Sequence, residues 1–133
     1  MPIILCIDDN RFGVAIRKLL LEAHGFEVLT AFNGQTGLAM LDMFKVDAVL
    51  LDYKMVGMNG DVVATRIRRK HPHLPIVLLS GSPSELPQRL LRIVDAFVVK
   101  GQAVEILLTA LEAVIGMSSE RPGVASGGLY SES

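Results

Sequence analysis

The stretch DAVLLDYKM, residues 47–55, decides the fold class of this 133-residue chain. Residues 48–51 are apolar on consecutive positions, and such a run is typical of a strand that is buried on both faces of a parallel sheet. The run ends at the carboxylate of Asp52. The sequence therefore predicts a buried parallel strand over residues 47–52 that brings an acidic group to one edge of its sheet.

Similar apolar runs lie on both sides of this one in the sequence. They are IILCI (3–7), FEVLTA (26–31), LPIVLLS (74–80) and DAFVVK (95–100). The segments between these runs carry a helical period. In the first of them the apolar period falls on Ile16, Leu19, Leu20 and Ala23. Strands that alternate with helices predict an α/β fold, in which a parallel sheet is covered by helices on both faces.

The ends of the helices can also be predicted. His24-Gly25 is suited to stop the first helix, and Asn33 is a good N-cap for the second. The third helix is expected over about 60–70, and the last over about 102–116. Between them we expect a short helix that starts near Ser84 and has Pro87 in its first turn.

Composition and length limit the kind of protein. The chain is long enough for one domain, which we place at 1–117, and we predict a disordered Gly/Ser-rich tail or linker at 118–133. A net charge of −1 without a basic stripe gives no reason to bind nucleic acid, and no apolar run is long enough to span a membrane. The only cysteine, Cys6, allows no internal disulfide and fits a reducing cytoplasm.

The residues at the strand ends point to chemistry. In open parallel sheets, ligands bind beyond the carboxyl ends of the strands. The polar residues at these ends are Asp8, Asp9, Asp52, Ser80 and Lys100. Three carboxylates at one edge repel each other, so a positive partner is expected. Lys100 is one candidate, and Mg²⁺, which prefers carboxylate and water oxygens, is the other.

Four motifs at these positions resemble a known family. IDDN (7–10), LLDYKM (50–55), LLSG (78–81) and FVVKG (97–101) are, in this order and on these strands, similar to the receiver domains of two-component response regulators. The resemblance covers residues 3–117. It implies a doubly wound, flavodoxin-like sheet with the strand order 2-1-3-4-5, and a switch that is operated by phosphorylation.

The resemblance also implies the acceptor and its metal site. Asp52 is the expected acceptor of a phosphoryl group from the phosphohistidine of a sensor kinase or phosphotransfer protein. Asp9 is expected to bind Mg²⁺ directly, and Asp8 mainly through a coordinated water. The backbone carbonyl of Lys54 is expected to complete the protein's share of the metal ligands.

Three further residues have implied roles in catalysis and switching. Lys100 is expected to pair with the phosphoryl oxygens, and Ser80 to donate a hydroxyl hydrogen bond to them. Phe97 occupies the position of the switch aromatic, which turns inward behind the shifted hydroxyl. Because phosphoryl transfer depends mainly on positioning and electrostatics, a metal, an ammonium and a hydroxyl around one carboxylate suit this chemistry.

The chain departs from the family pattern in three places. Val56 stands where proline is usual, which we expect to loosen the loop after Asp52. Gly101 follows Lys100 where a proline in a cis bond is usual, and because a cis bond without proline costs roughly 2.5–4 kcal/mol, we expect a trans bond. Lys54 places a cation two residues after the acceptor. It is interpreted either as screening the phosphoryl group or as a solvated loop residue.

The last helix is apolar over a wide arc. We expect it to pack on the sheet through Val104, Leu107, Leu108 and Leu111. The residues toward its flanks are Ala103, Ile106, Ala110, Ala113 and Val114. In the resembled family this helix belongs to the usual output face, so Ile106, Ala110 and Ala113 are predicted to bind a downstream protein or a second copy of the chain.

Three other kinds of protein fit the sequence less well. An aspartyl phosphohydrolase would have an acidic D-x-D pattern after the first strand, whereas here Asp8 and Asp9 are adjacent. A nucleotide- or flavin-binding module would have a glycine-rich phosphate loop after the first strand, and this sequence has none there. The main alternative is a pseudo-receiver that binds proteins without phosphorylation, favoured if Gly101 misplaces Lys100. We therefore expect a cytoplasmic signalling module that catalyses only its own modification, either alone or as part of a longer regulator.

Overall fold

The structure, a computed structural model, describes residues 1–119. Its sheet is parallel throughout, in the order β2-β1-β3-β4-β5, which confirms the predicted fold class and strand order. The strands are β1 (Ile3–Ile7), β2 (Glu27–Ala31), β3 (Ala48–Asp52), β4 (Ile76–Ser80) and β5 (Ala96–Val99). The helices are α1 (Arg11–Ala23), α2 (Gly34–Met43), α3 (Gly60–Lys70), α4 (Gln88–Ile93) and α5 (Val104–Ser119), with a 3₁₀ turn at Pro83–Glu85.

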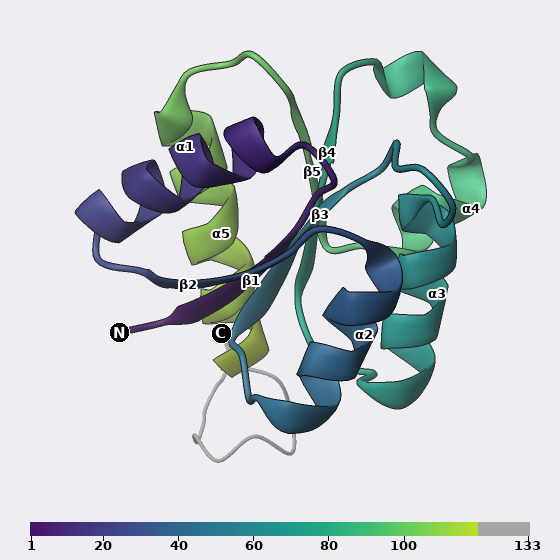
Figure 1. The fold of residues 1–133 in the computed structure, drawn as a ribbon, viewed down its shortest axis with the longest axis horizontal. Coiled ribbons are helices and arrows are strands. Elements are labelled where there is room, and N and C mark those ends of the chain that lie inside the picture. Colours follow the sequence, from purple (N-terminus) through teal and green to yellow (C-terminus); the bar gives the residue numbers. More distant parts are fainter. Residues whose placement is uncertain (120–133) are drawn as a thin grey trace.

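Helices cover both faces of the sheet (Figure 1). α1 and α5 lie on one face, and α2, α3 and α4 lie on the other. Successive residues of a strand point to opposite faces, so Leu50 joins the core under α5 while Leu51 joins the core under α3. This division explains why the central strands are apolar on consecutive positions.

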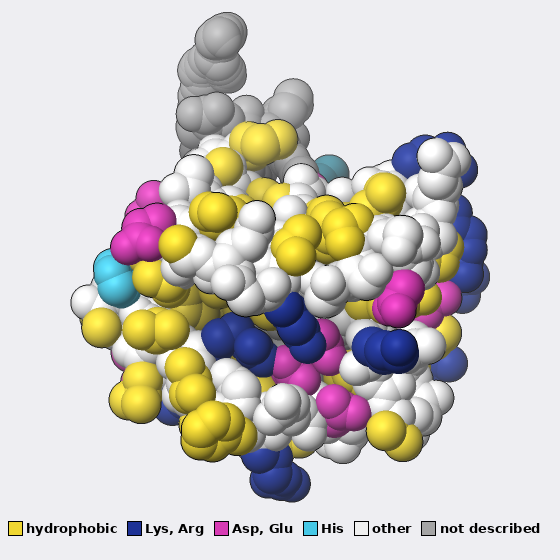
Figure 2. All heavy atoms as spheres, turned by 90° about the horizontal axis from the view of Figure 1, so that it is seen from above, with side chains coloured by type: hydrophobic (Ala, Val, Ile, Leu, Met, Phe, Trp, Pro, Cys, Tyr) yellow, Lys and Arg dark blue, Asp and Glu magenta, His cyan; other side chains and the backbone are white. Residues whose placement is uncertain are grey.

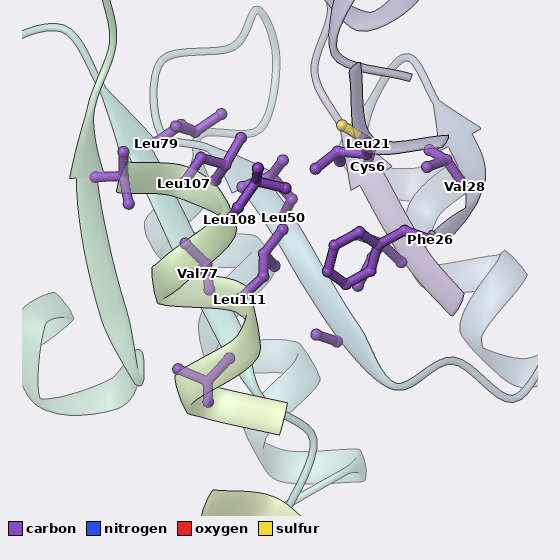
Figure 3. Close-up of a cluster of buried hydrophobic side chains, with 14 residues drawn as sticks. Cys6, Leu21, Phe26, Val28, Leu50, Val77, Leu79, Leu107, Leu108 and Leu111 are labelled. Carbon is purple, nitrogen blue, oxygen red and sulfur yellow. The ribbon is translucent and has the colours of Figure 1, made fainter. Parts of the chain in front are cut away.

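The core under α1 and α5 brings together side chains from most of the strands (Figure 3). Leu111 of α5 and Leu21 of α1 are fully buried in it, together with Phe26 and Val77. Cys6 is also part of this core, and burial raises the pKa of its thiol. A buried thiol with a raised pKa is unreactive at neutral pH.

Short-range signals fix the ends of α1 and α2. The side chain of Asn10 accepts a hydrogen bond from the Gly13 N–H at 3.0 Å, and Asn33 accepts one from the Thr36 N–H at 2.7 Å. These side chains satisfy N–H groups that have no partner within the helix. Gly25 follows α1 with φ +91°, a backbone conformation that suits glycine. The predicted stop of α1 and N-cap of α2 are therefore confirmed.

The segment between β4 and β5 differs from the prediction. A 3₁₀ turn covers Pro83–Glu85, and α4 begins only at Gln88. Pro87 is the N-cap of α4, with ψ 138°, and not a residue of its first turn. The cause is local, because a proline disfavours helical backbone in the residue before it. Leu86 is accordingly extended, and it separates the two short helices.

Helix α1 buries its less apolar face. Ile16, Leu19 and Leu20 carry the apolar period of the sequence, yet they are 43%, 70% and 39% exposed. The buried side chains of the helix are Val14 and Leu21, of which Leu21 belongs to the core under α1 and α5. The periodicity therefore indicated the helix correctly but marked the face that points to solvent.

Helix α5 packs on the sheet through Leu107, Leu108 and Leu111, as predicted, with Val104 partly buried beside them. Val114 was expected at the flank but is buried in the same core. The helix continues to Ser119, and residues 120–133 of the predicted tail lie outside the described part of the chain.

Within residues 1–119, no helix combines the length and the apolar character needed to cross a membrane.

Candidate functional site

The strand register brings the predicted site residues to one edge of the sheet. Asp52 and Ser80 are the last residues of β3 and β4. Ile7 pairs with Leu51, so Asp8, the next residue after β1, lies beside Asp52. Lys100 follows β5, and its N–H donates to the Ser80 carbonyl at 2.9 Å. Figure 2 looks down on this edge, where acidic side chains gather near the centre with basic ones beside them.

Three carboxylates meet at this edge. Asp8, Asp9 and Asp52 each offer an oxygen, and these oxygens lie within 4.8 Å of one another. Asp8 and Asp52 are buried, whereas Asp9 is exposed. Carboxylate oxygens that leave one side open to water are the donor set that Mg²⁺ prefers. The residues present therefore fit a magnesium ion.

Lys100 is the positive group that the Asp52 carboxylate contacts. Its Nζ lies 2.6 Å from Oδ1 of Asp52. No peptide bond among the described residues is cis, and Gly101 has φ +88°. The trans bond that we expected after Lys100 is thus present, and it does not displace the ammonium from Asp52. The geometry that would have favoured a pseudo-receiver is not observed.

Burial dominates the electrostatics of Asp52. The pKa of Asp52 is raised to about 6, mainly by the loss of hydration; the hydrogen bond and charge of Lys100 lower it, and the nearby carboxylate of Asp8 contributes to raising it. A carboxyl group with this pKa is mostly ionised at neutral pH. Asp52 can therefore act as a nucleophile, and its charge is less stabilised by water than that of an exposed aspartate.

The loop after Asp52 is held close to the three carboxylates. Gly60 approaches the backbone of Asp52 and Tyr53 so closely that a Cβ there would lie 2.8 Å from backbone atoms of both. The Val56 N–H donates to Oδ2 of Asp9 at 2.9 Å. Proline has no N–H, so the residue that departs from the family pattern makes a contact that the usual residue lacks. This contact ties the loop to the acidic cluster.

The remaining predicted site residues lie around this cluster. The Ser80 side chain is buried, and its hydroxyl donates to the Ser82 carbonyl at 3.1 Å. Phe97 is partly buried against the core under α3. The Lys54 side chain is 78% exposed, and its Nζ lies 3.8 Å from a Glu85 carboxylate oxygen. That distance across open solvent indicates a weak ion pair.

The sequence did not indicate the role of Arg17 in this site. Its guanidinium forms an ion pair with Oδ2 of Asp8, and the side chain is 18% exposed. The spacing of Val14, Arg17 and Leu21 places all three on the buried face of α1. That spacing was a usable signal, but it was hidden by the larger apolar stripe on the other face.

Comparison with known proteins gives a consistent result. The family described as response regulator receiver domain matches residues 4–112. The chain is 39% identical over 87 residues to the transcriptional regulatory protein CpxR of Klebsiella pneumoniae, which covers 65% of this chain and 37% of that protein. It is 34% identical over 84 residues to the autoinducer 1 sensor kinase/phosphatase LuxN of Vibrio harveyi, covering 63% of this chain and 10% of that protein. The chain thus spans about a third or less of these relatives.

Solved structures agree with the fold. The response regulator protein TrrA of Thermotoga maritima, in complex with Mg²⁺-BeF, has a TM-score of 0.82 and 30% identity, covering 86% of this chain and 99% of that one. A response regulator receiver domain protein from Clostridium thermocellum has a TM-score of 0.83 and 26% identity, covering 90% of this chain and 98% of that one. Both likenesses extend over nearly the whole described sheet and its helices.

Proposed function

Because the chain belongs to the response regulator receiver domain family, we propose that it is a cytoplasmic phosphorylation switch whose acceptor is Asp52. The observation that carries this proposal is the surroundings of Asp52. It is a buried carboxylate at the end of the central strand, 2.6 Å from an ammonium and next to two further carboxylates. A structural aspartate has no need of this arrangement, whereas a phosphoryl acceptor requires it.

The proposed transfer forms one bond to Asp52 and breaks one bond in the donor. A carboxylate oxygen of Asp52 attacks the phosphorus of a phosphohistidine on the partner protein. The P–O bond forms as the P–N bond breaks, and the imidazole leaves with the electron pair and takes up a proton. Lys100 then pairs with a phosphoryl oxygen in place of the carboxylate it contacts now. The reaction modifies the protein itself, so the chain is not an enzyme that turns over an external substrate.

Magnesium would be held by Asp8, Asp9, Asp52 and the backbone carbonyl of Lys54. When bound, it supplies positive charge to the phosphoryl oxygens in the transition state. The protein contributes a fixed cluster of oxygens, and Gly60 and Val56 keep the loop that carries Lys54 close to it. The TrrA neighbour was solved with Mg²⁺-BeF, which supports the same type of ligand at this site.

Ser80 and Phe97 would transmit the phosphorylation of Asp52 to the output surface. In the structure the Ser80 hydroxyl bonds to Ser82. On phosphorylation we propose that it turns to a phosphoryl oxygen, and that Phe97 moves into the space behind it. The output surface would include Ile106, which is 45% exposed, and Ala113, which is also exposed, while Ala110 is partly buried.

The first test is phosphorylation by a small donor. We expect acetyl phosphate and Mg²⁺ to add the mass of one phosphoryl group to the intact protein, and EDTA to prevent it. The Asp52→Asn variant should gain nothing, because the amide is not a nucleophile, and Lys100→Met should react more slowly because the phosphoryl charge loses its ammonium. Equal labelling of wild type and Asp52→Asn would reject the proposal.

Helix α1 offers a docking surface for the protein donor. Its exposed stripe consists of Phe12, Ile16, Leu19 and Leu20, of which Phe12 is 76% and Leu19 70% exposed. α1 begins two residues after Asp9, and hydrophobic side chains gather on the α1 side of the acidic cluster in Figure 2. A phosphohistidine must reach Asp52 from this edge, so its carrier would cover this stripe. Apolar stripes next to a reactive site are typical of interaction surfaces.

A matched pair of variants tests this surface. Leu19→Glu should slow phosphoryl transfer from the histidine-phosphorylated partner at least about tenfold, because it places a charge in an apolar contact, while labelling by acetyl phosphate stays unchanged. Ile106→Glu makes the same kind of change on α5 and should leave both reactions intact. Loss of both reactions in Leu19→Glu would indicate a folding defect, and unchanged transfer would remove α1 from the docking surface.

A further inference from the structure

The Arg17 guanidinium is held at the site mainly by one carboxylate. Its Nη2 pairs with Oδ2 of Asp8, whereas its Nε is buried and has no hydrogen-bond partner among the described residues. The other oxygen of Asp8 accepts the Asn10 N–H at 3.0 Å. Both oxygens of Asp8 are therefore engaged by the protein itself, although Asp8 belongs to the three-carboxylate cluster.

Arg68 shows what a structural arginine looks like in the same chain. Its guanidinium donates to the carbonyls of Pro72, Leu74 and Ile93 and to the carboxylate of Asp95, at 2.8–3.1 Å. All of its nitrogens are used. Arg17 has a single carboxylate partner, a hydrogen bond to the Cys6 thiol and one unused buried donor, so Asp8 is the only charged group in these contacts that fixes its position.

We infer that Arg17 is a built-in cation that competes with the divalent metal for Asp8 and thereby lowers the metal affinity of the site. This inference rests on the proposed magnesium site. Without metal, Arg17 neutralises a buried carboxylate that would otherwise lack a positive partner. A metal bound to the cluster would be repelled by the positive charge of Arg17. To bind Asp8, it would have to replace Arg17 as the partner of this carboxylate. Arg17 is thus a positioning residue that sets the metal concentration at which the switch becomes competent.

Metal binding can be measured without phosphorylation. We would titrate each protein with Mn²⁺, follow free Mn²⁺ by electron paramagnetic resonance, and displace it with Mg²⁺. Arg17→Met should bind both ions about tenfold more tightly, which corresponds to about 1.4 kcal/mol of removed repulsion. Arg17→Gln keeps a polar side chain and should show the same gain if the methionine variant folds poorly.

Lys18→Met is the matched control. It removes one positive charge from the same helix, but Lys18 pairs with Glu22 and the Val28 carbonyl, away from the cluster. Its metal affinity should stay within about twofold of wild type, because salt screens a distant exposed charge. As a second measurement, Mg²⁺ should raise the melting temperature of Arg17→Met by more than it raises that of wild type.

The outcomes separate the inference from the proposed function. Metal binding by wild type with equal or weaker binding by both Arg17 variants would overturn the inference and leave the magnesium site in place. Binding by none of the proteins would overturn both. A gain in Lys18→Met as large as that in Arg17→Met would show a general charge effect, and would also overturn the inference.

Discussion

Arg68→Met is expected to lower the free energy of unfolding by about 3 kcal/mol and the melting temperature by about 10 °C. Arg68 lies on α3, and its guanidinium ties that helix to the start of β5 through Asp95, at 2.8 Å. The same group holds the end of α4 through two hydrogen bonds to the Ile93 carbonyl. The substitution leaves a largely buried carboxylate without the guanidinium that faces it, which is among the larger penalties a single change can cause.

Chemical denaturation with and without the change measures this effect. Arg69→Met is the control, because Arg69 lies on the same helix but is exposed, and it should change stability by less than about 0.5 kcal/mol. Arg68→Lys should recover only part of the loss, because an ammonium cannot reproduce the planar set of hydrogen bonds. If Arg68→Met were as stable as Arg69→Met, this contact would not hold α3, α4 and β5 together.

The second expectation is that Asp52→Asn stabilises the metal-free protein at pH 8. Burial raises the pKa of Asp52 to about 6 in the folded state, compared with about 3.9 in an unfolded chain. The folded state therefore binds this proton more tightly, and stability falls as the pH rises from about 4 to about 6. Above that range the ionised, buried carboxylate lowers stability by about 1–2 kcal/mol, when solvent screening at this open edge is allowed for.

Denaturation in EDTA at several pH values tests this expectation. The stability gain of Asp52→Asn over wild type should be largest at pH 8 and should shrink as the pH falls toward 4. Asp42→Asn, which removes an exposed carboxylate that pairs with Lys70 at 2.7 Å, should change stability little at any pH. A gain for Asp52→Asn that does not depend on pH would show that ionisation of Asp52 is not its cause.

Most of the fold could be predicted from the sequence because the central strands carry redundant signals. IILCI, AVLLD and IVLLS are apolar on both faces, and the first is followed by a polar residue while the other two end in one, so their boundaries are clear. The start of the helix near Pro87 was predicted incorrectly, because two prolines in a short segment allow the helix to be interrupted at more than one residue. The restriction that Pro87 imposes on Leu86 selects the interruption that is observed, and the helix resumes at Gln88.

The site was predictable where topology alone brings residues together. Parallel strands place Asp8, Asp52 and Lys100 at one edge once the strand order is known. The contact of the Val56 N–H was not predictable, because it depends on the path of one loop. The spacing of Arg17 with Val14 and Leu21 did carry a signal, but the larger apolar stripe of α1 concealed it. The apolar period of α1 falls on its exposed stripe. Periodicity alone does not distinguish a face that binds a partner from a face that packs in the core, because both can have the same pattern.

The most direct test of the central claim is to identify the carboxylate that becomes phosphorylated. The protein would be treated with acetyl phosphate and Mg²⁺ and then with borohydride, which reduces an acyl phosphate to an alcohol and converts the modified aspartate into homoserine. Peptide mass spectrometry would locate that residue. We predict homoserine at Asp52 only, and none when the donor or Mg²⁺ is omitted. Homoserine at Asp8 or Asp9, or at no residue, would contradict the assignment of Asp52 as the acceptor.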